Sequence, residues 1–215
     1  MNREMYLYPL IFVIFFVLGC ATTAEERYIN KLSELERTYL KVTTVKTNAN
    51  LTIKGGRLGL LPLTSNKPMV GNVVSDTIGN KLLDSNLKVV DPTYLVKIIE
   101  EQGISLAGLT ERIDYSRIGK LSNVDFILVG TVTMVDRTYE LVPLPIPIHR
   151  AHSYTECSGA TARIIDVTTG DVLVSAVYDT TRVSLKWQRP TQIGQALATG
   201  LKYGLWKLSQ RKPVR

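Results

Sequence analysis

The chain has 215 residues, of which 45% are hydrophobic and 21% charged, with two cysteines and a formal net charge of +7. This composition excludes a disordered, collagen-like or disulfide-stapled protein, and it provides enough apolar residues for the core of one domain. The basic charge suits an anionic partner, and the compartment decides which anion the protein meets.

The first 19 residues are typical of a secretory signal peptide. The apolar run Tyr6–Leu18 follows one basic residue, Arg3, and is too short to span a bilayer as a helix. The tetrapeptide Val17-Leu18-Gly19-Cys20 resembles the lipobox of bacterial lipoproteins, in which the cysteine is acylated and becomes the first residue. We therefore expect a lipid anchor on Cys20. An ordinary cleaved signal peptide with an incidental cysteine is the alternative.

The two residues after the cysteine favour the outer membrane. Aspartate at these positions retains lipoproteins in the inner membrane of enteric-type bacteria, and here Ala21 and Thr22 occupy them. We therefore expect a lipid-anchored protein that faces the periplasm. An exported protein meets little nucleic acid, so the expected partners are the membrane and envelope proteins. A basic charge that is only dispersed over the surface is the alternative.

Residues 20–54 are predicted to form a tether, and residues 55–210 a single domain. Within the tether, apolar residues recur at helical spacing over Ala24–Leu40, whereas Lys41–Lys54 favours a loop or a weak strand. The first predicted elements of the domain are a strand at Arg57–Leu63, a helix at Gly71–Ser85, a strand at Leu87–Val90, a helix from Pro92 to Gln102, a short helix at Asp114–Leu121 and a strand at Val124–Val135.

A hairpin and a helix are predicted to complete the domain after a long loop. The hairpin pairs Thr161–Val167 with Val172–Val183, and the helix covers Pro190–Leu208, where small residues recur beside leucines. Taken together, the elements predict an α/β (α+β) fold. We expect a single mixed β-sheet domain with a C-terminal antiparallel hairpin, flanked by helices.

Motifs that carry chemistry are scarce in this sequence. His149, His152 and Cys157 could contribute to a zinc site, but a fourth ligand is not apparent. Neither a phosphate-binding glycine loop nor a nucleophile motif occurs. The adjacent pair Glu100-Glu101 diverges by about 100° on a helix and cannot flank one bond. The sequence therefore predicts no enzyme, no cofactor, no metal and no catalytic residue.

An ordered series of segments resembles the CsgG/HfaB-type outer-membrane lipoproteins. The segments are Gly59–Leu63, Leu87–Asp91, Ile98–Gln102, Ile118–Leu121, Asp125–Val132 and Ala162–Leu173. The resemblance implies a non-enzymatic lipoprotein that acts through protein–protein contacts in cell-envelope assembly or secretion. The related LpoB-type lipoproteins activate peptidoglycan synthases, which is the alternative function. A secreted hydrolase or metal-binding protein is a third hypothesis, and the missing motifs argue against it. Homo-oligomerisation is left open.

The sequence departs from the channel-forming members of that family, which send two hairpins per subunit across the outer membrane. Only Ser184–Arg189 is available for the second hairpin. The first would come from Tyr139–Cys157, which contains Pro143, Pro145 and Pro147, and these prolines remove hydrogen-bond donors. We therefore predict a member without transmembrane hairpins.

The proline-rich segment is also the candidate partner-docking segment. Its apolar side chains alternate with prolines that favour an extended backbone, so docking loses little conformational entropy. The candidate docking residues are Leu141, Leu144, Ile146 and Ile148. A loop folded over its own domain is the alternative. Cys157, which has no partner once Cys20 is acylated, is predicted to be a buried structural thiol.

Overall fold

The computed structural model describes residues 23–48, 51, 53, 55–101, 103, 115–140, 151–180 and 189–211. The chain divides into two compact units, one ending at Arg37 and one beginning at Thr38. The helices are α2 (Ala24–Lys31), α3 (Glu34–Lys41), α4 (Pro68–Leu82), α5 (Pro92–Glu101), α6 (Tyr115–Ser122) and α7 (Pro190–Ser209). The strands are β1 (Thr43–Thr47), β2 (Gly56–Leu60), β3 (Thr64–Ser65), β4 (Leu87–Val90), β5 (Phe126–Glu140), β6 (Ala151–Asp166) and β7 (Val172–Tyr178).

The helix predicted over Ala24–Leu40 is divided into α2 and α3. The hydroxyl oxygen of Thr23 accepts a hydrogen bond from the N–H of Glu26, whose carboxylate accepts one from the N–H of Thr23. Ser33 and Glu36 repeat this reciprocal arrangement at the start of α3. Each capping box favours a new helix start, which explains why the helical pattern is interrupted between the two.

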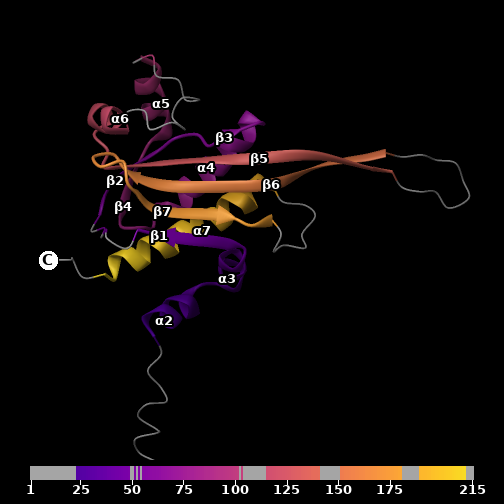
Figure 1. Ribbon diagram of the computed structural model, residues 1–215, viewed down its shortest axis with the longest axis horizontal. Helices are drawn as coiled ribbons and strands as arrows, with labels where there is room; N and C mark the ends of the chain where they lie inside the picture. The colour runs from indigo at the N-terminus through magenta and orange to yellow at the C-terminus, as the bar shows by residue number, and fades with distance from the viewer. Residues whose placement is uncertain are drawn as a thin grey trace, which may run out of the picture. The chain divides into compact units, whose positions relative to one another are not determined.

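The unit that begins at Thr38 contains an open mixed sheet of seven strands (Figure 1). The strand order is β1-β7-β6-β5-β2-β4, and β3 also pairs with β5. Strands β4, β2 and β5 are parallel, whereas β5, β6, β7 and β1 pair antiparallel in that order. The structure thus confirms the predicted α/β fold with one mixed sheet flanked by helices.

The two faces of the sheet are covered by different helices. Helices α4 and α7 pack on one face, where Leu60 of β2 and Val174 of β7 share a core with Ile193 and Leu197 of α7. Helices α5 and α6 pack on the other face against β2 and β5. This second core therefore belongs to the parallel half of the sheet.

The β5–β6 hairpin is much longer than predicted. The long loop predicted between Val135 and Thr161 is wrong, because β5 continues to Glu140 and β6 begins at Ala151. Strand β7 pairs with β6 only from Ala160 onward, so the far part of the hairpin is a two-stranded ribbon that extends past the neighbouring strands (Figure 1). The three prolines lie outside the described residues.

The bounds of several other elements differ from the predicted bounds by a few residues. Thr43–Thr47, within the predicted tether, forms edge strand β1 and pairs with β7. Strand β2 ends at Leu60 rather than Leu63, and β7 ends at Tyr178 rather than Val183. The predicted strand at Leu87–Val90 is confirmed, as are the cap and the end of α5: Asp91 Oδ1 accepts a hydrogen bond from the N–H of Thr93, and Gly103 has a φ of 63°.

Candidate functional site

The winding of the chain changes direction at strand β2. From β2 the chain passes through α4 to β4 on one side, and then through α5 and α6 to β5 on the other side of β2. Helix α4 lies on one face of the sheet, and α5 and α6 lie on the opposite face. In open α/β sheets, ligands bind at such a switch point, outside the carboxyl ends of the strands.

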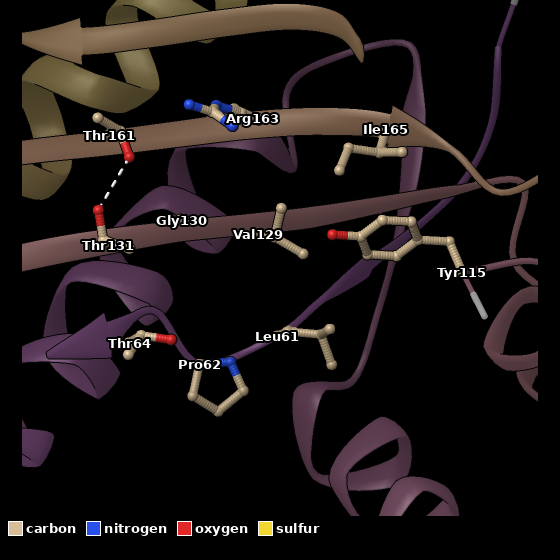
Figure 2. Close-up of a pocket in the computed structure, with 10 residues that line it drawn as sticks. All are labelled: Leu61, Pro62, Thr64, Tyr115, Val129, Gly130, Thr131, Thr161, Arg163 and Ile165. Carbon is tan, nitrogen blue, oxygen red and sulfur yellow. Dashed lines mark hydrogen bonds between the residues drawn. The ribbon is translucent and has the colours of Figure 1, made fainter. Parts of the chain in front are cut away.

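A pocket of about 280 Å³ lies at this switch point (Figure 2). Its walls come from the residues that follow β2, from the middle of β5, from the facing part of β6 and from Tyr115 at the start of α6. These segments are distant in sequence and meet because β5 pairs with both β2 and β6. The pocket is therefore a product of the sheet topology.

The pocket combines polar and apolar side chains, and both kinds lie on the same faces of β5 and β6. The hydroxyl oxygens of Thr131 and Thr161 lie 3.1 Å apart across β5 and β6, and Arg163 follows on the same face of β6. Figure 2 shows the phenol oxygen of Tyr115 directed toward β5 at Val129. The apolar side chains that complete the lining are Leu61, Pro62, Val129 and Ile165.

The charges in the pocket suit recognition of an anion. Arg163 is exposed, and the ion pairs found among the described residues do not include it. It is also the only charged side chain among the described residues that line the pocket. Burial raises the pKa of Tyr115, and the positive charge of Arg163 partly opposes that shift. Tyr115 therefore keeps its proton at neutral pH.

A polar surface on the antiparallel half of the sheet continues from this pocket. Side chains alternate along strands, so the residues between the core positions of β6, β7 and β1 point away from α7. The residues that pair across the three strands form two rows. One row contains Arg163, Ser175 and Lys46, and the next contains Thr161, Val177 and Thr44. We call these six residues the open face. Arg163 and Lys46 are exposed and the other four are half-buried.

Cys157 lies on the core side of β6 and not in this site. The thiol is free and its residue is 3% exposed. Burial raises the pKa of Cys157 to about 11, and burial also raises the pKa of the neighbouring Tyr178 to about 12. A protonated, buried thiol is inert, which agrees with the predicted structural role.

Most of the predicted site residues lie outside the described part of the chain. These are Cys20 and the docking residues Leu141, Leu144, Ile146 and Ile148, which stay predictions. His149 is also outside it, whereas His152 and Cys157 lie in β6. Among the residues that the structure describes, no group of three or more His, Cys, Asp or Glu side chains could hold a metal ion. In the same part of the chain, no helix combines the length and apolar content of a membrane span.

Tyr115, Thr131 and Arg163 were not predicted from the sequence to be site residues. The alternation of side chains in Thr161–Val167 already placed Thr161 and Arg163 on one face of a strand. The same face continues with Ile165 and Val167, so alternation alone did not mark it as the wall of a pocket. No local pattern in the sequence predicted that Tyr115 would line the same pocket.

Comparisons with known proteins give low similarity. No protein-family model matches the chain, and no curated protein matches it. Among solved structures, the PelC dodecamer from Paraburkholderia phytofirmans is 15% identical, with a TM-score of 0.42 over 79% of this chain and 99% of that one. Lipoprotein GNA1162 from Neisseria meningitidis is 14% identical, with a TM-score of 0.40 over 60% of this chain and 86% of that one. The LpoB C-terminal domain from Escherichia coli is 13% identical, with a TM-score of 0.38 over 66% and 93%. At these values the similarities assign no function to this chain.

Proposed function

We propose that the protein is a non-enzymatic lipoprotein of the bacterial outer membrane whose domain binds envelope proteins during cell-envelope assembly or secretion. The tetrapeptide Val17-Leu18-Gly19-Cys20, which resembles a lipobox, supports the lipid anchor. The resemblance of the domain segments to CsgG-type lipoproteins supports the class of role. The observation that carries the binding role is the open face, a polar surface next to a pocket.

The composition of the open face suits a reversible protein contact. It presents hydroxyl groups, one half-buried valine and two basic side chains, Arg163 and Lys46, and none of its six residues is acidic. Arginine is enriched in protein interfaces, and a positive surface accelerates the association with an acidic partner. The expected partner surface is therefore flat and acidic.

Activation of a peptidoglycan synthase, as in the LpoB-type lipoproteins, is the second candidate. Such a role requires the domain to reach far from the outer membrane. Helices α2 and α3 occupy much of the chain between Cys20 and β1. A helical residue advances the chain by about 1.5 Å, less than half of the extended value, which shortens the reach. We therefore place this function second.

Metabolic labelling with a fatty acid tests the anchor. The wild-type chain should incorporate the label, and the Cys20→Ser variant should not, because the acylated thiol is absent. An exposed serine elsewhere, Ser158→Ala, is the matched control and should leave the label unchanged. Equal labelling of wild type and Cys20→Ser would contradict the lipoprotein assignment.

Site-specific photo-crosslinking in the producing cell tests the binding surface. A photoreactive residue at Thr44 or Ser175, on the open face, should crosslink to a discrete envelope protein identified by mass spectrometry. The same residue at Asn80, which is exposed on α4, is the control and should not. Equal crosslinking from Asn80, or no crosslinking from the open face, would exclude that face as the binding surface.

A further inference from the structure

We propose that the pocket at the carboxyl end of β2 binds a carboxylate carried on a short aliphatic body. The ligand class includes a free small carboxylic acid and the C-terminus of a peptide that ends in an aliphatic residue. The proposal rests on the arrangement of Arg163 and two threonines beside apolar side chains. It goes beyond the proposed function and does not depend on the lipid anchor.

Arg163 provides the charge that selects an anion. Its guanidinium group offers parallel N–H donors that match the two oxygens of a carboxylate. Because no second charged side chain is found among the described residues of the lining, one bound negative charge is balanced by one positive charge. A phosphate dianion would need further positive charge. The single arginine therefore favours a monovalent carboxylate.

The hydroxyl groups provide a further donor at the same wall. In the Thr131–Thr161 pair one hydroxyl donates to the other, so one O–H group of the pair remains able to donate to a ligand. Thr161 precedes Arg163 by two positions, which places them roughly 6–7 Å apart along β6 and on the same face. A carboxylate in the pocket can thus be hydrogen bonded from more than one strand.

The apolar part of the lining determines the body of the ligand. It consists of the aliphatic side chains of Leu61, Val129 and Ile165. The volume of about 280 Å³ is near the lower limit for small-molecule pockets, so the apolar part of the ligand has only a few carbon atoms. A branched chain of the size of a leucine side chain fits this description.

The test is a titration of the purified full chain, followed by NMR of its backbone amides. The probes are 4-methylpentanoate, its neutral analogue 4-methylpentanamide, and the peptide acetyl-Gly-Gly-Leu with a free carboxylate. The acid should cause saturable shifts at Thr131, Thr161 and Arg163. The neutral amide should bind roughly ten-fold or more weakly, because it cannot pair with the guanidinium group.

Two variants make the test specific. Arg163→Gln should weaken binding of the acid by roughly ten-fold or more, whereas Lys88→Gln, an exposed basic residue on β4, should leave it unchanged. Arg163→Lys keeps the charge without the parallel donors and should bind with intermediate affinity. Because Arg163 is exposed, these changes should leave the fold intact.

The results of these titrations distinguish a peptide C-terminus from a free acid. Other results would contradict the proposal. Tighter binding of the peptide than of the free acid assigns the pocket to a peptide C-terminus, and equal or weaker binding assigns it to a free acid. Absence of saturable shifts up to the solubility limit of the acid overturns the proposal. So does equal binding of acid and amide, or unchanged binding by Arg163→Gln. None of these results depends on acylation or on crosslinking from the open face.

Discussion

The side-chain amide of Asn66 forms two hydrogen bonds with the main chain of Met134. Its Nδ2 donates to the carbonyl oxygen at 2.6 Å, and its Oδ1 accepts from the N–H at 2.9 Å. The β5–β6 register shifts between Thr133 and Met134, and β3 ends at Ser65, one residue before Asn66. The amide therefore takes the place of a further β3 residue at the bulge where the ribbon leaves the sheet.

Replacement of Asn66 by alanine should destabilise the protein at this bulge. The change leaves the N–H and the carbonyl of Met134 without their partner, so the free energy of unfolding should fall by about 1–3 kcal/mol. Urea unfolding measures the loss, and hydrogen exchange should accelerate at the amide of Met134. Asn80→Ala, at an exposed position of α4, is the control. Equal effects of the two changes would show that the amide bridge adds no stability.

The neighbouring ion pair should contribute much less. Lys67 Nζ and Asp136 Oδ1 lie 2.6 Å apart, but their side chains are 37% and 63% exposed. Water and salt screen such a pair, so a double-mutant cycle with Lys67→Ala and Asp136→Ala should give a coupling free energy of at most about 1 kcal/mol. The coupling should decrease as salt is added. A larger, salt-independent value would contradict this assignment.

The contact between α4 and α7 depends on Gly194. A Cβ atom there would lie 2.6 Å from Cβ of Thr77 and 3.0 Å from the carbonyl oxygen of Val74. Gly194→Ala would add about 1 kcal/mol of helix propensity, but the overlap should outweigh it and give a net loss of about 1–3 kcal/mol in thermal or urea unfolding.

A glycine with open space is the control for this prediction. At Gly159 an added Cβ meets nothing within 4 Å, and its φ is not positive. Gly159→Ala should therefore leave the free energy of unfolding unchanged or raise it slightly. If Gly194→Ala is as stable as Gly159→Ala, the helices can separate at no free-energy penalty and the close contact does not restrict position 194.

Alkaline conditions should destabilise the fold through Cys157. The pKa of this thiol is raised from 9.0 to about 11 in the folded protein. Between these pH values the unfolded chain has lost the proton and the folded chain retains it, so the free energy of unfolding falls as the pH rises. The loss should be about 2 kcal/mol near pH 11. Urea unfolding at several pH values measures it.

The variant Cys157→Ala isolates this contribution. Its stability should decline less between pH 9 and 11 than that of the wild type, because the titrating thiol is absent. A remaining decline is expected from Tyr178, whose pKa is raised from 10.0 to about 12. Identical pH profiles for the two proteins would show that Cys157 titrates normally in the folded state.

Local features of this fold could be predicted from the sequence alone. Helix α5 follows from Asp91-Pro92 at its start and Gly103 at its end, and the small residues of α7 anticipate its close packing. The mixed sheet followed from the order of strands and helices. These features depend on neighbours along the chain, namely caps, turns and the spacing of apolar residues.

Only the tertiary structure decided how polar strands pair and which residues form the pocket. The polar strand β1 joins the sheet because β7 provides its partner, and Ala151–Cys157 is a strand because β5 lies beside it. Leu61, Tyr115 and Arg163 are brought together by parallel pairing of β2 with β5 and by the placement of α6. Strands with little apolar alternation acquire their hydrogen-bond partners from distant segments, so no short stretch of sequence specifies where they lie.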